Sequence, residues 1–267
     1  MELRPTTGPN MAGDLGRAAI ERGFDLILAA GGDGTINEVL NGIVGSKVVF
    51  GALPSGTANV LANEVGLSGR PDRAAAELLD AVPVRVAVGA VDQAGHPRRY
   101  FLLMAGIGLD ARIVSELDLE LKKKVGKLAY WHGGLRQLGR DMPRFRISVN
   151  GHVHVASFAL VSRVRNYGGD FEIAKDVRLT DNDFEIVIQE RDRSFDVVRF
   201  LMAVVLNRLK STNGISVIRA SRAVMAPVNG IPVHAQVDGE AIGALPATIS
   251  IVPDAVTLLL PKRYAEG

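Results

Sequence analysis

Two glycine-containing loops hold the residues of this chain that are best suited to chemistry. The first is Gly31-Gly32-Asp33-Gly34-Thr35, and the second is Ser55-Gly56-Thr57-Ala58-Asn59. Each follows an apolar run that is typical of a buried parallel strand, and each opens an amphipathic helix. Glycine lets the backbone approach a ligand closely, and the N–H groups at a helix start attract anions. A single loop of this kind is more often a tight turn, but two of them predict a phosphate-binding site.

The acidic residue in the first loop indicates a metal ion. Asp33 alone would repel phosphate, whereas Mg²⁺ takes carboxylate and water ligands and bridges phosphate oxygens. Thr35 and Thr57 add hydroxyl groups at the ends of neighbouring strands, where open α/β sheets bind their ligands. We therefore expect a nucleoside triphosphate, with Asp33 as a Mg²⁺ ligand.

Five motifs in this order resemble the diacylglycerol kinase catalytic-domain family, which includes bacterial lipid kinases and sphingosine kinases. After the two loops come Gly106-Ile107-Gly108-Leu109-Asp110-Ala111, Asn166-Tyr167-Gly168-Gly169 and Val237-Asp238-Gly239-Glu240. The resemblance covers nearly the whole chain. It implies an ATP-dependent, Mg²⁺-requiring lipid kinase that transfers the γ-phosphoryl group to a hydroxyl of a diacylglycerol-like or sphingoid lipid.

The resemblance also implies individual roles. Glu240 matches the general base that takes the proton from the lipid hydroxyl, and Asp238 is a second candidate for that role or for Mg²⁺. Asp110 is expected to face the same cleft. The residues expected to bind the nucleotide are Thr6, Gly31, Gly32, Asp33, Gly34, Thr35, Asn37, Glu38, Gly56, Thr57 and Asn59.

A second metal position is implied by the segment from Arg178 to Phe184. In some bacterial relatives the corresponding loop holds a structural Mg²⁺, which maps to the Asp181 carboxylate and the carbonyl groups of Arg178 and Asp183. The alternative is an ordinary exposed turn.

The chain departs from the family pattern in two places. Relatives usually begin with a strand that ends in an Asn-Pro turn, whereas Met1 to Thr6 look like the family's second strand. Either the start is truncated or the nucleotide site is incomplete. In many relatives an Asp follows the Asn of the second loop, but Val60 stands there in this chain.

The organisation predicted from the pattern is two domains. Strands and helices alternate in residues 1–81, which predicts an α/β nucleotide-binding domain on a parallel sheet. From Val82 the pattern becomes mostly β, so residues 82–267 are predicted to form a β-sandwich-like lipid-substrate domain. Asn150-Gly151 and Asn229-Gly230 are typical hairpin turns, and helical insertions are expected at 114–138 and 194–210.

Composition restricts the environment of the protein. The 267 residues include no cysteine, and no apolar run approaches the ~20 residues that a spanning helix needs. We expect a cytoplasmic protein with peripheral membrane association. The net charge is +2, but basic residues gather between Lys122 and Arg146. This stretch is either a solvated helix face or a surface for anionic lipid headgroups.

Three other functions compete with the lipid kinase. A catalytically silent nucleotide- or lipid-binding relative is one, and an NAD kinase, which shares the Gly-Gly-Asp-Gly loop, is another. A Rossmann dehydrogenase is excluded because no G-x-G-x-x-G sequence follows a strand. No aromatic-studded basic strand accompanies the charge, so no nucleic-acid partner is expected. The sequence leaves the oligomeric state open, with a homodimer as one alternative.

Overall fold

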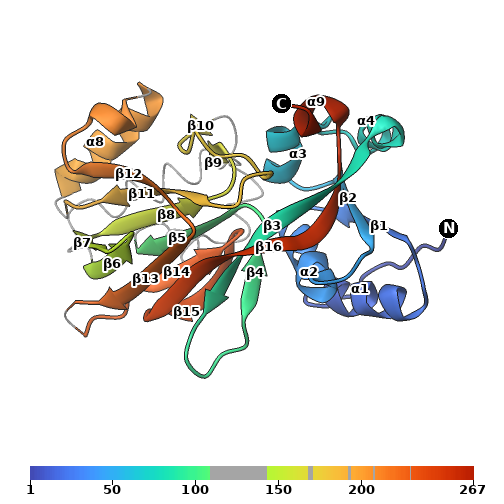
Figure 1. Cartoon of the computed structure of the whole chain (residues 1–267), viewed down its shortest axis with the longest axis horizontal. Coiled ribbons are helices and arrows are strands. Elements are labelled where there is room, and N and C mark those ends of the chain that lie inside the picture. Colours follow the sequence, from blue (N-terminus) through green and yellow to red (C-terminus); the bar gives the residue numbers. More distant parts are fainter. Residues whose placement is uncertain (109–142, 168–170, 192–193, 207, 229) are drawn as a thin grey trace.

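The computed structural model describes residues 1–108, 143–167, 171–191, 194–206, 208–228 and 230–267. Several predicted features lie wholly or partly outside these residues: Asp110, the helical insertion expected at 114–138, the basic stretch between Lys122 and Arg146, and the Asn229-Gly230 turn. Within them, an α/β part and a mostly β part are joined along shared strands (Figure 1).

The α/β part contains the first elements of the chain. They are α1 (Ala12–Glu21), β1 (Leu26–Gly31), α2 (Asp33–Ile43), β2 (Val49–Pro54), α3 (Val60–Val65), α4 (Pro71–Glu77) and the short 3₁₀ helix η1 (Leu78–Asp80). Strands β1 and β2 pair in parallel, as the two apolar runs predict. Leu40, Ile43 and Phe50 are fully buried between α2 and the sheet. Residues 1–6, expected to resemble a strand, form none, and their Glu2 carboxylate is paired instead with Arg22, the residue that follows α1.

The β part is built on two large sheets that share one core, and a separate two-stranded sheet is formed by its strands β9 and β10. Its first strands are β3 (Val82–Asp92), β4 (Arg99–Phe101), β5 (Met104–Gly108), β6 (Phe145–Val149), β7 (His152–Ala156), β8 (Phe158–Ser162), β9 (Asn166–Tyr167), β10 (Phe171–Glu172) and β11 (Phe184–Gln189). The later ones are β12 (Ile215–Ala220), β13 (Arg222–Pro227), β14 (His234–Val237), β15 (Glu240–Ala244) and β16 (Ala247–Leu260). The second sheet has the order β12-β11-β8-β5-β14-β15.

The core of this sandwich draws on both sheets. Phe145 and Ile147 of β6 are fully buried in one cluster with Ile107 of β5 and Phe184 of β11. Apolar residues alternate along these strands because successive side chains point to opposite faces. The predicted fold class, an α/β domain followed by a β-sandwich-like domain, is confirmed.

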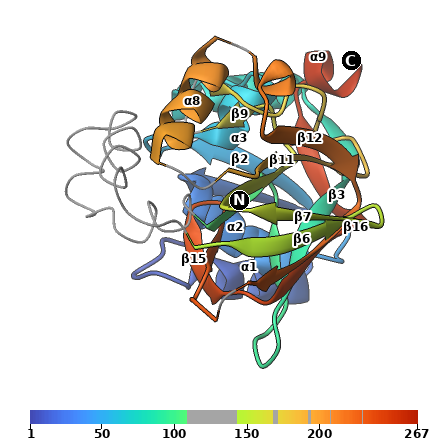
Figure 2. The same cartoon turned by 90° about the vertical axis from the view of Figure 1, so that its left-hand side faces the viewer.

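Helices flank the sandwich. Helix α8 (Ser194–Val205) is followed by the 3₁₀ helix η2 (Leu209–Ser211), and α9 (Lys262–Ala265) ends the chain. Phe200 of α8 packs edge-on against Phe158 of β8, with ring centroids 5.1 Å apart, and Figure 2 shows α8 on the same upper side of the molecule as α9. No helix in the described ranges is long and apolar enough to cross a membrane.

Strand β16 connects the two parts. Its first half pairs with β13, while Thr257 and Leu258 pair in parallel with Val49 and Phe50 of β2. Strand β3 runs antiparallel to β16 along both halves (Figure 1). The end of the chain, within the range predicted for the second domain, thus extends the sheet that carries the glycine loops. The two parts are thereby held in one continuous hydrogen-bonded frame.

Candidate active site

The two glycine loops lie against each other at one edge of the parallel sheet. Gly31 is paired with Pro54 at the ends of the strands, and the Ser55 N–H donates to the Gly31 carbonyl at 2.9 Å. A Cβ atom added to Gly56 would lie 2.6 Å from the Cα of Gly32. No side chain fits at such a distance, so glycine is required for the loops to meet.

Asp33 joins the first loop to the helix that follows the second. Its carboxylate accepts hydrogen bonds from the N–H groups of Val60 at 3.0 Å and Leu61 at 3.3 Å, at the start of α3. These hydrogen bonds give Asp33 a structural role at the start of α3 that sequence reasoning did not foresee, and its contact with Mg²⁺ stays a prediction.

The backbone around these loops is suited to an anion. Helix α2 begins after Gly32, whose position carries no side-chain cap, and its N-terminal end has the positive pole of the helix dipole. Ser55, Gly56 and Thr57 are exposed. The amide of Asn59 closes the second loop on itself, accepting from the Gly56 N–H at 2.8 Å and donating to the Gly56 carbonyl at 3.0 Å.

Two predicted nucleotide ligands, Asn37 and Glu38, have protein partners instead. Asn37 is fully buried, and its amide donates to the Tyr100 carbonyl at 3.1 Å and to Asp238 Oδ2 at 2.9 Å. The Glu38 carboxylate accepts from the N–H groups of Asn10 and Ala12 at 2.9 and 3.0 Å, where α1 begins. These side chains brace α2 on both sides, and a direct contact with a nucleotide stays a prediction.

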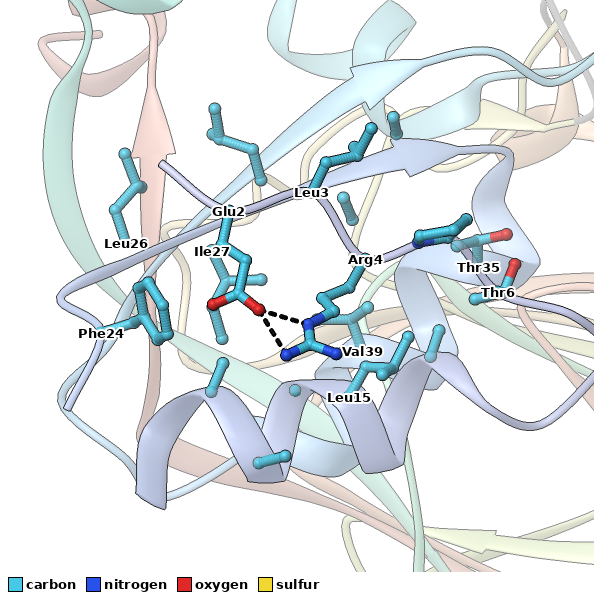
Figure 3. Close-up of a pocket in the computed structure, with 18 of the residues that line it drawn as sticks. Glu2, Leu3, Arg4, Thr6, Leu15, Phe24, Leu26, Ile27, Thr35 and Val39 are labelled. Atoms are coloured by element: carbon cyan, nitrogen blue, oxygen red, sulfur yellow. Dashed lines mark hydrogen bonds and ion pairs between the residues drawn. The ribbon is translucent and has the colours of Figure 1, made fainter. Parts of the chain in front are cut away.

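Thr6 lies in an apolar cavity of about 650 Å³ beside β1. The cavity is bounded by the N-terminal segment, α1 and β1, and Thr6 and Thr35 are both among its lining residues (Figure 3). Leu26 and Leu28 of β1 also line it, and both remain nearly half exposed. The cavity places an apolar space directly next to the first glycine loop.

The predicted catalytic turn is a tight hairpin between β14 and β15. Asp238 and Gly239 both have positive φ angles, 47° and 86°, and Val237 pairs with Glu240 across the turn. Two consecutive left-handed residues are typical of the two-residue hairpins for which Asp-Gly is favoured. The turn places Glu240 over the first glycine loop, because its Oε1 atom would lie 3.5 Å from a Cβ added to Gly34.

Asp238 faces the interior rather than the cleft. Its carboxylate accepts from the backbone N–H groups of Leu102, Leu103 and Met104 at 2.9 to 3.0 Å and from the Asn37 amide at 2.9 Å. Burial raises the pKa of Asp238 to about 6, against the opposite effect of these donors. These contacts fix the turn that carries Glu240, whereas a role for Asp238 as base or metal ligand stays a prediction.

The loop from Arg178 to Asp183 balances its charges with arginine. Arg219 donates to Asp181 at 2.8 Å and to Asp183 at 2.9 Å, and these hydrogen bonds, the one with Asp183 foremost, raise the pKa of Arg219. The Arg178 carbonyl already accepts the Asp181 N–H, and the Asp181 carbonyl accepts from Arg163. Among the described residues no group of three or more His, Cys, Asp or Glu side chains is arranged for a metal ion. The Asp181 carboxylate and the Arg178 carbonyl thus already have protein partners, and the implied Mg²⁺ at this loop stays a prediction of the resemblance.

Sequence reasoning missed three residues around the catalytic turn. Arg99 pairs with Glu240, while the backbone of Tyr100 is held by Asn37 and by Asn41. Asn41 lies one helical turn after Asn37 on the same face of α2, which is the only local signal that links them. The pairing of Arg99 with Glu240 spans 141 residues of sequence and has no local signal.

Comparison with known proteins agrees with this arrangement. The diacylglycerol kinase catalytic domain profile matches residues 1–91, and the YegS C-terminal NAD kinase beta sandwich-like domain profile matches residues 104–260, more than half of the chain. The chain therefore belongs to the family of diacylglycerol kinases and YegS-like lipid kinases.

Individual relatives resemble the chain over most of its length. Diacylglycerol kinase of Bacillus subtilis (strain 168) is 29% identical over 271 residues, covering 98% of this chain and 87% of that protein. A probable lipid kinase YegS-like protein of Chromohalobacter salexigens is 27% identical, covering 94% and 81%. A crystal structure of a diacylglycerol kinase from Bacillus anthracis str. Sterne has the same fold, with a TM-score of 0.77 at 22% identity, over 97% of this chain and 85% of that one.

Proposed function

We propose that this protein is an ATP-dependent, Mg²⁺-requiring lipid kinase that phosphorylates a hydroxyl group of a diacylglycerol-like or sphingoid lipid. The proposal rests on one observation. The Glu240 carboxylate, contributed by the β sandwich, stands at Gly34 in the loop that is suited to phosphate. A base and a phosphate cradle from opposite sides of one cleft are what phosphoryl transfer to an alcohol requires.

In the proposed reaction the protein mainly positions the reactants. The backbone N–H groups at the start of α2 would hold the phosphates, with the second glycine loop packed against them, and Asp33 would hold Mg²⁺, whose charge would offset that of the phosphates. Glu240 accepts the proton of the lipid hydroxyl as its oxygen attacks the γ-phosphorus. The bond to the ADP oxygen breaks, and phospholipid and ADP leave. The apolar cavity at Thr6 and Thr35 is proposed to receive the nucleoside.

The acceptor is proposed to be presented at an anionic membrane surface. The relatives named as diacylglycerol kinases support a lipid acceptor, and the basic residues Lys122, Lys123, Lys124 and Lys127 support anionic headgroups nearby. Exposed charges are screened over roughly 8 Å at physiological ionic strength. Activity on anionic vesicles should therefore fall with added salt, and replacement of the four lysines by Gln should remove that dependence.

The direct test is phosphate transfer from labelled ATP with Mg²⁺ to dispersed diacylglycerol, monoacylglycerol, ceramide, sphingosine and NAD⁺. We expect a lipid product from the parent. Asp33→Asn should lose most turnover, and because Asp33 also binds α3 it should melt a few degrees lower. Glu21→Gln on α1, an exposed carboxylate far from the loops, is the matched control.

The alternatives have distinct outcomes in the same assay. Phosphorylation of NAD⁺ alone would make the protein an NAD kinase. Binding of a non-hydrolysable ATP analogue without transfer to any acceptor would make it a silent binder. Equal turnover in Asp33→Asn and Glu21→Gln would remove Asp33 from the proposed site.

A further inference from the structure

The Glu240 carboxylate forms an ion pair with one arginine. Arg99 Nη2 lies 2.6 Å from Glu240 Oε2, and the two side chains are 37% and 31% exposed. Arg99 Nε is buried and has no hydrogen-bond partner among the described residues. Glu240 Oε1, the oxygen on the side of Gly34, likewise has no recorded partner among them. The ion pair thus uses one oxygen of the carboxylate and leaves the other toward the phosphate loop.

The backbone next to Arg99 is fixed to the helix that forms the phosphate loop. The Tyr100 N–H donates to Asn41 Oδ1 at 2.9 Å, and the Tyr100 carbonyl accepts from the amides of Asn37 and Asn41 at 3.1 and 2.9 Å. Both asparagines lie on α2, whose N-terminus follows Gly32. The backbone beside Arg99 is therefore hydrogen-bonded to the helix that follows the first glycine loop, and Glu240 of β15 contacts Arg99 through its side chain.

A carboxylate at this position creates an electrostatic problem for a kinase. The terminal phosphate of a triphosphate carries more charge than any other part of the ligand, and like charges within a few ångströms disfavour binding. A neighbouring guanidinium removes the net charge of the carboxylate while leaving its second oxygen available as a base. The chain offers this cation only at Arg99 among the described residues that contact Glu240.

We propose that Arg99 is a positioning residue for the reaction: it orients Glu240 and neutralises it, so that the terminal phosphate of a nucleoside triphosphate can bind beside the base. This inference rests on the proposed function and adds a residue to its site. It predicts that Arg99 acts specifically on ligands with a γ-phosphate. A merely structural ion pair would affect ATP and ADP alike.

The adjacent arginine provides a matched control. Arg98 pairs with Asp92 through two hydrogen bonds of 2.7 and 2.9 Å, and both side chains are largely exposed and lie on the β3–β4 hairpin. The replacement Arg98→Gln therefore removes a neighbouring arginine–carboxylate ion pair, which has two hydrogen bonds where Arg99 has one, without touching Glu240.

Calorimetry with ADP and with a non-hydrolysable ATP analogue tests the inference. Arg99→Gln should bind the ATP analogue roughly tenfold more weakly than the parent, with a much smaller change for ADP, and Arg98→Gln should match the parent. Arg99→Lys, which retains the charge, should recover most of the loss. The double variant Arg99→Gln/Glu240→Gln should also recover it, because no unneutralised carboxylate remains.

Three results would overturn the inference: equal ATP-analogue affinity in Arg99→Gln and Arg98→Gln, an equal loss for ADP, or no recovery in the double variant. The lipid assay is run in parallel on the same preparations. If the parent binds the analogue but phosphorylates no lipid, the proposed function is wrong. The difference between the affinities for the ATP analogue and for ADP still tests the role of Arg99. A parent that binds neither nucleotide overturns both.

Discussion

The Asp238-Gly239 turn and the loop from Arg178 to Asp183 each carry two carboxylates, and each has one arginine ion partner, yet the carboxylates are used differently. In the loop, Asp181 and Asp183 both bind Arg219 of β12, so neither carboxylate is without a cation partner. In the turn, Asp238 is buried among N–H donors while Glu240 is one third exposed and shares only one oxygen with Arg99.

This difference separates carboxylates that are held by protein partners from one that is left accessible, as the proposed reaction requires. Asp238 has its acceptor positions filled, as is expected of a buried polar group that maintains a local conformation. Glu240 remains one third exposed and lies beside Gly34 of the first glycine loop. Proximity of the two residues in sequence therefore does not give them one role.

The difference between the two regions is tested most directly by replacing one carboxylate in each of them with an amide. Glu240→Gln should lower lipid phosphorylation by about 10²–10⁴-fold, which is the usual contribution of a general base. Binding of the ATP analogue should persist, because the glycine loops are unchanged. Asp183→Asn, the control in the other region, should keep the turnover of the parent in the same assay. Comparable losses in both variants would show that the two regions do not differ in this way.

The buried carboxylate of the turn can be examined through pH. Burial raises the pKa of Asp238 to about 6, above the value of about 4 in an unfolded chain, so the folded state binds the proton more tightly. This contribution to the free energy of unfolding is fully present below pH 4 and is lost as the pH rises through 6. Two pKa units correspond to at most about 3 kcal/mol.

We therefore expect the free energy of unfolding of the parent, relative to Asp238→Asn, to fall by up to about 3 kcal/mol between pH 4 and pH 7. Asp254→Asn is the matched control, because Asp254 is exposed and has nearly the same φ angle, 48° against 47°. Denaturant titrations at each pH measure both differences. A rise with pH would mean that the four N–H donors outweigh burial.

Much of the site could be predicted because its signals are local. The glycine loops follow their strands directly, and the Asp238-Gly239 turn has the residues that its backbone requires. Residue type within a short segment determines such features. The Asn150-Gly151 hairpin was predicted for the same reason, and both residues have positive φ angles.

The other features of the site depend on contacts between residues that are far apart in the sequence, and no local pattern in a single sequence indicates such contacts. Asn37 and Asp238 are 201 residues apart, and only the folded chain shows that this amide holds the catalytic turn instead of facing the cleft. The same applies to β16, whose end adds to the sheet of the glycine loops. Family resemblance identifies Asn37 and Glu38 as positions in the site but gives no sign of the protein partners that hold their side chains, and their contact with a nucleotide stays a prediction.

The smallest expected effect concerns the arginine of the Arg178–Asp183 loop. Arg219→Gln removes the partner of both carboxylates, and because these side chains are about one third exposed the loss should be only about 1 kcal/mol of stability. For a chain of this size, that corresponds to a fall of roughly 2–4 °C in melting temperature. Turnover should be unchanged, since the loop does not carry Glu240. Arg222→Gln, which replaces an exposed arginine on β13, is the control.

If Arg219 is the only cation that binds the carboxylates of this loop, millimolar Mg²⁺ without nucleotide should leave the melting temperature of the parent unaltered. A Mg²⁺-dependent rise that disappears in Asp181→Asn would instead establish the metal site that the resemblance implies, and the two carboxylate regions would then differ in the cation that serves each.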